Sequence, residues 1–168
     1  MNIRQATKSD MDVILRIYNR ARVFMKEHGN PTQWDASYPS ADMIASDMNR
    51  GCHYVCLEQG EVVGTFALLM GAEPTYQVIE QGAWHYDIPY GTIHRVASSG
   101  TGKGVAKGCF DFCRTQIDYL RIDTHHDNYP MQKAITQYGF QRCGVIHVDD
   151  GSARIAYDYY THTLPRNY

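Results

Sequence analysis

The sequence predicts a mixed α/β fold, in which a central twisted sheet of about seven strands is flanked by about four helices. A strand, a helix and a second strand follow one another between residues 90 and 124, and strands joined through a helix in this way run parallel. Two other strand pairs meet at short turns, Gln59-Gly60 and Asp149-Asp150-Gly151, which are typical of antiparallel hairpins. Parallel and antiparallel pairs together require a mixed sheet.

The expected elements alternate along the whole chain. Runs of β-branched and aromatic residues predict strands at residues 2–6, 53–57, 61–70, 90–97, 120–124, 142–148 and 153–160. Apolar residues at helical spacing, together with end signals, predict helices at residues 9–28, 39–51, 105–117 and 130–138. The first helix begins at a capping-box pattern, Ser9-Asp10-Met11-Asp12, and ends where Gly29 and Pro31 prevent it from continuing.

Length, composition and charge exclude several classes of protein. A chain of 168 residues favours a single domain, residues 1–168, with its own hydrophobic core. Its net charge of -2 offers no general attraction to nucleic acid or to an anionic membrane. The longest apolar stretch, residues 62–72, is too short to span a membrane. Because the N-terminus has no apolar signal segment and the five cysteines are an odd number, we expect a cytoplasmic protein with free thiols.

A glycine-rich turn, residues 98–104 with the sequence SSGTGKG, joins an expected strand to an expected helix. Its glycines let a ligand approach the main chain, and the first turn of the helix leaves unpaired N–H groups at a positive dipole end. Phosphate binding is the natural use of such a turn, and a merely tight connection is the alternative. The spacing fits neither a P-loop, since Ala97 and Gly104 stand where a glycine and a hydroxyl are needed, nor a dinucleotide-binding fingerprint.

At this junction the chain resembles the GNAT superfamily of acetyl-CoA-dependent N-acyltransferases. The family signature is Arg or Gln, two residues, Gly, one residue, then Gly or Ala, and residues 101–106 match it with Thr101 in the first place. Residues 123–128, DTHHDN, followed by a helix ending in Gly139-Phe140, are similar to a later family motif, in which Asn128 corresponds to a cofactor-contacting asparagine. The order of elements is similar over nearly the whole chain. Further features resemble a bacterial branch of the family: Trp34, Tyr38-Pro39, His94-Arg95 and residues 154–157.

The resemblance implies an N-acetyltransferase that uses acetyl-CoA as co-substrate and no metal. The pyrophosphate would lie at the glycine turn, and the pantetheine arm between the strands that end near residues 97 and 123. The cofactor-binding residues expected on this basis are Val96, Ala97, Thr101, Gly102, Lys103, Gly104, Val105, Ala106 and Asn128. An amine would attack the thioester directly in a ternary complex, which requires a neutral amine, an oxyanion donor such as the N–H near Ala97, and a proton for the thiolate.

Two positions depart from the family's pattern. Thr101 lacks the long donor that usually stands there, so phosphate binding would depend more on Lys103 and on the backbone. Ile135 stands where the family often has a tyrosine that protonates the leaving thiolate, and isoleucine cannot donate a proton. Tyr138, about one turn further along the helix, is therefore the expected substitute acid, with His94 as the expected base.

His94 and Arg95 are neighbours on the central strand. Because successive strand residues face opposite sides, we expect only one of them to face the cleft. His94 could accept the proton of the amine, or it could be a buried structural histidine. Arg95 and Asp123, on neighbouring strands, are expected to form an ion pair that either braces the sheet or contacts substrate.

Aromatic rings and carboxylates lie in the segments that the resemblance assigns to the acceptor, and such groups suit a cationic amine. The expected substrate-binding residues are Trp34, Tyr38, Trp84, Arg95 and Asp123, with Glu73, His85 and Asp87 in the same segments. We therefore expect a small primary amine as the acceptor. A protein N-terminus or lysine is one alternative, and a non-catalytic acyl-CoA sensor is another. A homodimer is also left open.

Three pairs of cysteine and histidine raise the alternative of a zinc site. Cys52 and Cys56, Cys109 and Cys113, and Cys143 and His147 are each separated by three residues rather than two. The cysteine pairs would each fall on one face of an element, as small core residues do. Residues 125–127, His-His-Asp, are expected to be a loop that leads to Asn128, and no metal site is expected.

Overall fold

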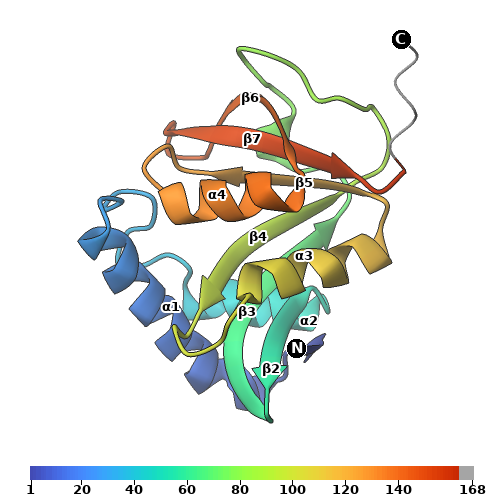
Figure 1. Cartoon of the computed structure of the whole chain (residues 1–168). Coiled ribbons are helices and arrows are strands. Elements are labelled where there is room, and N and C mark those ends of the chain that lie inside the picture. The colour runs from blue at the N-terminus through green and yellow to red at the C-terminus, as the bar shows by residue number, and fades with distance from the viewer. Residues whose placement is uncertain (163–168) are drawn as a thin grey trace.

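The computed structural model describes residues 1–162 and contains one mixed sheet of seven strands with helices on both faces (Figure 1). The strands are β1 Asn2–Gln5, β2 His53–Glu58, β3 Glu61–Met70, β4 Gly91–Ser98, β5 Tyr119–Thr124, β6 Gln141–His147 and β7 Ala153–Tyr160. The helices are α1 Met11–Glu27, α2 Ala41–Asn49, α3 Val105–Gln116 and α4 Tyr129–Tyr138. The predicted fold class is confirmed, and the predicted strands and helices begin and end within about two residues of the observed ones.

The order of the strands in the sheet is β1-β2-β3-β4-β5-β7-β6. β4 and β5 are parallel and joined through α3, whereas the pairs β2–β3 and β6–β7 are antiparallel hairpins, as predicted. β7 lies between β5 and β6, so the last strand within residues 1–162 is an inner strand and β6 forms the edge beyond it.

Two hydrophobic cores cover the two faces of the sheet. One joins α3 and α4 to the sheet, with Phe110, Leu120 and Ile135 among its buried residues, and the other joins α1 and α2 to it around Tyr18 and Ile44. Cys56, Cys109 and Cys113 belong to the first core, as small core residues, and all five cysteines are free and buried. Within residues 1–162, no helix combines the length and the apolar composition that crossing a membrane requires.

β4 and β5 pair only from Gly91–Ile93 to Leu120–Ile122 and then diverge. The divergence begins where β4 contains an irregularity. His94 pairs with Ala67 and Ala97 pairs with Thr65, so β4 has one more residue than β3 between these two pairs. At this bulge Arg95 has a φ of 57°, which is unusual for a residue with a side chain. The hydroxyl of Tyr18 donates to the Arg95 carbonyl at 2.9 Å and holds the bulge in place. The result is an open wedge between two central strands.

The capping box lies two residues earlier than predicted, at Thr7 and Asp10, where it begins a short 3-10 helix, Lys8–Asp10, that leads into α1. The Asp10 carboxylate accepts from the Thr7 N–H at 2.8 Å and from the Arg4 guanidinium at 2.7 and 2.9 Å. The hydrogen bond from Arg4, above all, lowers the pKa of Asp10 to about 2. Asp10 is bound in this way because β1 carries Arg4 past the start of the helix.

Asp10→Asn is expected to lower the free energy of unfolding at neutral pH by about 1 to 2 kcal/mol, allowing for solvent screening. Because the folded-state pKa is depressed, the contribution is full above the unfolded pKa and is lost as the pH falls through about 2. Denaturant unfolding of both proteins at neutral and at strongly acidic pH measures this difference. A difference that persists unchanged in acid would contradict the assignment.

Candidate active site

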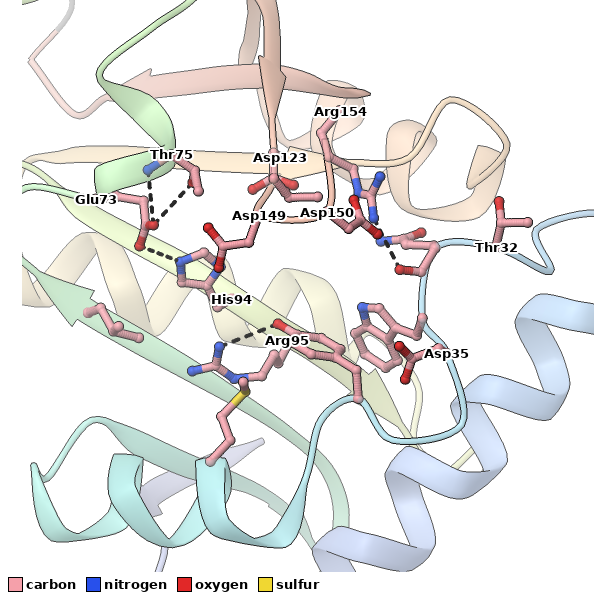
Figure 2. Close-up of a pocket in the computed structure, with 16 residues that line it drawn as sticks. Thr32, Asp35, Glu73, Thr75, His94, Arg95, Asp123, Asp149, Asp150 and Arg154 are labelled. Carbon is pink, nitrogen blue, oxygen red and sulfur yellow. Dashed lines mark hydrogen bonds and ion pairs between the residues drawn. The ribbon is translucent and has the colours of Figure 1, made fainter. Parts of the chain in front are cut away.

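Two adjoining cavities open where β4 and β5 diverge. The larger has a volume of about 430 Å³ and extends over the loop after α1, the strands and the β6–β7 turn (Figure 2). The smaller, of about 60 Å³, lies deeper in the wedge between the two strands. The residues that line both cavities are Gln33, Trp34, Tyr38, His94, Arg95 and Asp123. Four of the five predicted substrate-binding residues are therefore brought together at this boundary.

The larger cavity is acidic. Its carboxylates are Asp35, Glu73, Asp123, Asp149 and Asp150. Of its two arginines, Arg95 forms an ion pair with the buried Asp47, and Arg154 donates to the Gln33 carbonyl at 3.1 Å and to Ser152 at 2.8 Å. The charge of Arg95 is thus compensated from below the cavity, and the lining keeps an excess of negative charge. Such a cavity favours a cationic ligand.

The predicted ion pair between Arg95 and Asp123 is wrong. Arg95 binds Asp47 and lies 3.5 Å from the Tyr38 hydroxyl, while Asp123 accepts a 2.6 Å hydrogen bond from the Tyr76 hydroxyl. The expectation that only one of His94 and Arg95 faces the cleft is also wrong, because both line the larger cavity. The bulge at Arg95 interrupts the alternation of the strand, which is the physical reason for both differences.

His94 is held by Glu73, which follows β3 in the chain. His94 Nε2 lies 3.1 Å from Glu73 Oε2, and the other carboxylate oxygen accepts from the Thr75 hydroxyl at 3.1 Å. The hydrogen bond from His94, above all, lowers the pKa of Glu73, so Glu73 is a carboxylate at neutral pH. A carboxylate at Nε2 favours the tautomer with its proton there, which leaves the Nδ1 lone pair free. With 18% of its side chain exposed, His94 is neither a core residue nor a surface one.

The smaller cavity is lined by Val96 of β4, Ile122 of β5 and Met131 of α4, together with Asn128. Asn128 caps α4, since its Oδ1 accepts from the Met131 N–H at 3.2 Å, and its amide donates to Gln33 at 2.8 Å. The wedge therefore offers unpaired strand edges beside a mixed lining, which is apolar at Val96, Ile122 and Met131 and polar at Asn128. An extended chain could pair with these edges as an added strand does.

The glycine turn leads from the end of β4 into α3. Gly104 is the N-cap of α3, with a φ of 68°, and no side chain caps the helix, so its first N–H groups remain available to an anion. A β-carbon at Gly102 would come within 2.7 Å of Val63, so the turn packs closely against β3. Thr101 and Lys103 are exposed, whereas the Val105 side chain is buried in the core and leaves only its backbone for a ligand.

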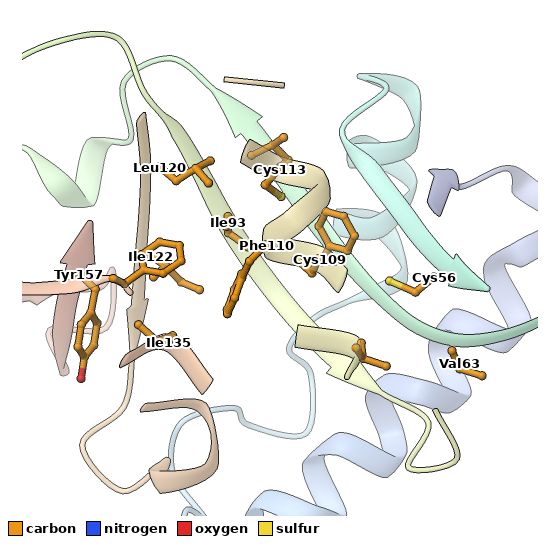
Figure 3. Close-up of a cluster of buried hydrophobic side chains, with 14 residues drawn as sticks. Cys56, Val63, Ile93, Cys109, Phe110, Cys113, Leu120, Ile122, Ile135 and Tyr157 are labelled. Carbon is orange, nitrogen blue, oxygen red and sulfur yellow. The ribbon is translucent and has the colours of Figure 1, made fainter. Parts of the chain in front are cut away.

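Neither the predicted acid, Tyr138, nor the predicted substrate-binding residue Trp84 lines either cavity, and Ala97 and residues 101–106 of the glycine turn also lie outside both. The Tyr138 hydroxyl donates to Asp111 at 2.8 Å, because this position on α4 faces α3 rather than the wedge. Trp84 donates to the Tyr76 carbonyl at 3.0 Å and its ring covers the Arg121 guanidinium at 4.2 Å, so it stabilises a buried cation of the protein itself. Ile135 is fully buried in the core with Ile122 (Figure 3).

Sequence reasoning missed several residues of the site. Asp149 and Asp150 are predicted only as a hairpin turn, yet they line the larger cavity. Asp47, which compensates Arg95, and Tyr76, which binds Asp123, carry no local signal of such roles. All four depend on contacts between segments far apart in the chain.

The fold is similar to those of solved bacterial acetyltransferases. A GNAT-family acetyltransferase from Streptococcus agalactiae shares 30% identity, covers 96% of both chains and has a TM-score of 0.88. For a putative acetyltransferase from Staphylococcus aureus the identity is 23%, the coverage 96% of this chain and 100% of the other, and the TM-score 0.71. A putative acetyltransferase from Salmonella typhimurium, solved with acetyl-CoA, shares 17% identity with this chain. The match covers 99% of this chain and 98% of the other, and its TM-score is 0.59. No family model and no curated protein matches the chain.

Proposed function

The chain belongs to the GNAT family of acetyltransferases, and from this premise we propose that it transfers an acetyl group from acetyl-CoA to a primary amine of a small cationic molecule. The observation that carries the proposal is the junction of the wedge between β4 and β5 with an acidic cavity at His94 and Asp123. A thioester that enters from one side and an amine that enters from the other would meet at this junction.

The proposed cofactor site consists of the glycine turn and the wedge. The N–H groups at the start of α3 and the exposed Lys103 would bind the pyrophosphate, and the edges of β4 and β5 would bind the pantetheine arm. The fold neighbour solved with acetyl-CoA supports binding of a CoA derivative by this fold. The N–H near Ala97, beside the bulge, is the proposed donor to the oxyanion.

His94 is the proposed base. Bound acetyl-CoA supplies a thioester carbonyl that an amine can attack, which forms the amide bond and breaks the bond from carbon to sulfur. His94 Nδ1 would take the proton of the amine, and the same imidazolium would return that proton to the thiolate. This route needs no tyrosine on α4, which agrees with Ile135 being buried and Tyr138 being bound to Asp111. Glu73 stabilises the imidazolium between the two transfers.

The acceptor follows from the lining of the larger cavity. Its volume falls within the range of small-molecule sites, about 300 to 1,000 Å³. Five carboxylates attract an ammonium group, and the rings of Trp34 and Tyr38 offer it aromatic faces. A small amine that carries a second positive charge, away from the reacting nitrogen, fits this lining better than an amine without that second charge.

We expect acetyl-CoA and CoA to raise the melting temperature, and ATP and NAD not to raise it. We also expect thiol release from acetyl-CoA with small diamines, and little release with their mono-acetylated forms or with an amino alcohol, because each of these carries only one amino group and so lacks the second positive charge. A fluorescence melt and a thiol-reactive dye measure the two effects. Faster turnover of a peptide N-terminus or a lysine peptide would favour a protein acceptor instead.

A cofactor-induced shift without thiol release from any amine would favour the non-catalytic sensor, which the absence of a tyrosine at Ile135 also suggests. No shift with either acetyl-CoA or CoA would contradict the proposed function at its first step.

A further inference from the structure

Three side chains of metal-ligating type meet outside the two cavities: His85, Cys143 and Asp158. His85 Nδ1 lies 2.8 Å from Asp158 Oδ1 and 3.4 Å from Cys143 Sγ, and the three ligand atoms lie within 4.8 Å of one another. They come from the loop between β3 and β4, from β6 and from β7. None of them lines either cavity, so this cluster is separate from the candidate active site.

The local structure explains why these three residues meet. The register between β6 and β7 shifts between Arg142 and Gly144, so Cys143 is the extra residue of a bulge. Gly82 packs directly against the main chain of Cys143, where a β-carbon would overlap the Cys143 carbonyl. Because the loop can approach so closely, His85 reaches the bulge. The spacing in the sequence associates Cys143 with His147, whereas the structure associates it with a histidine 58 positions away.

The charge of Asp158 also favours a cation here. Only 4% of its side chain is exposed, and within residues 1–162 its sole ion-pair partner is His85. Arg121, its cross-strand neighbour on β5, instead stacks on the rings of Trp84 and Tyr90. A buried carboxylate without a permanent positive partner is costly, and a bound metal ion would remove that cost.

The oxygens of Asp158 have different roles. Oδ2 accepts from the backbone N–H of His85 at 2.9 Å and from the Tyr119 hydroxyl at 2.7 Å, so the carboxylate is held in a fixed orientation. Oδ1 is thereby directed to His85 Nδ1. Hydrogen bonds of this kind to a ligating carboxylate are typical of metal sites, because they fix the ligand before the ion arrives.

We propose that His85, Cys143 and Asp158 bind one divalent transition-metal ion of the zinc and cobalt class, with water as the fourth ligand. Sulfur, imidazole nitrogen and carboxylate oxygen are the ligands that such ions prefer, and hard cations such as Mg²⁺ do not use thiolates. A tetrahedral ion needs separations of about 3.3 to 3.6 Å between ligand atoms. The distance between His85 Nδ1 and Asp158 Oδ1, 2.8 Å, would therefore have to increase by about half an ångström. The distance between His85 Nδ1 and Cys143 Sγ, 3.4 Å, already lies in this range.

Binding balances charge and protons. Burial, above all, raises the pKa of the Cys143 thiol, so the free protein holds a neutral thiol there, and the ion displaces its proton to solvent. His85 would bind through Nδ1 and carry its proton on Nε2. The thiolate and the carboxylate then neutralise the two charges of the ion. With 41% of its side chain exposed, His85 gives the ion a route from solvent.

The bound ion would fasten the loop between β3 and β4 to β6 and β7. The same loop carries Glu73, which holds His94. Because the three ligands lie outside both cavities, we expect the ion to stabilise the fold and not to enter the acetyl-transfer chemistry.

The test is a titration of the untagged, reduced, metal-free chain with Co²⁺. We expect a thiolate-to-cobalt absorption band that saturates at one ion per chain, is displaced by Zn²⁺ and is unaffected by Mg²⁺. Zn²⁺ should also raise the melting temperature. His85→Ala and Cys143→Ser should each weaken Co²⁺ binding by about 100-fold or more and abolish the band.

The matched control is His126→Ala, because His126 belongs to a second cluster, with His125 and Asp127, that has no thiol. This variant should retain the band and the shift. If Cys143→Ser fails to fold, the half-exposed His85→Ala decides the question, with its circular dichroism as the check. No band in the wild-type chain, or a band unchanged in His85→Ala, would overturn the proposal. Acetyl-CoA binding is not needed for either outcome.

Discussion

Replacing Gly104 with aspartate is expected to lower the affinity for acetyl-CoA by about 100-fold or more while the chain still folds. Two like charges about 4 Å apart near a protein surface repel by about 4 kcal/mol, and each 1.4 kcal/mol is a tenfold change in affinity. Gly104 caps α3 with a φ of 68°, and an added β-carbon would meet no atom within 4 Å. Aspartate tolerates this left-handed conformation better than most residues, so the effect should be electrostatic rather than structural.

Gly60→Asp is the matched control. Gly60 has a φ of 83° and equally open space, but it lies in the turn between β2 and β3. Calorimetric titration with acetyl-CoA should give wild-type affinity for this variant and almost none for Gly104→Asp. Equal affinity in the two variants would remove the start of α3 from the proposed cofactor site.

His94→Ala is expected to reduce kcat by about 100- to 10,000-fold, which is the usual contribution of a general base. The KM for acetyl-CoA should change far less, because His94 would act on the amine rather than hold the cofactor. Steady-state rates at neutral pH, with the concentrations of amine and of acetyl-CoA varied in turn, test both points.

Glu73→Gln separates the base from the residue that positions it. The amide keeps the size of the side chain and removes its negative charge, so the imidazolium loses its stabilising partner. We expect a smaller loss of kcat than in His94→Ala, with little change in the KM for acetyl-CoA. If His94→Ala retains the wild-type rate, another group must be the base.

Local patterns in the sequence were sufficient to predict the elements and the glycine turn. The turns at Gln59-Gly60 and at residues 149–151 and the stop of α4 at Gly139 all depend on residues a few positions apart. Short-range rules for turns and caps apply there without knowledge of the rest of the fold. The resemblance of the glycine turn, and of the motif that ends at Asn128, to motifs of the GNAT family depends on the same local information.

The sequence by itself thus determined the class of fold, the order of its elements and the place of the candidate cofactor turn. Only the tertiary structure decided that β7 enters between β5 and β6, that His94 is held by Glu73 and that Tyr138 faces Asp111. The physical reason is that these contacts join residues far apart in the chain. The bulge at Arg95, held by Tyr18, also breaks the alternation from which a strand's two faces are predicted.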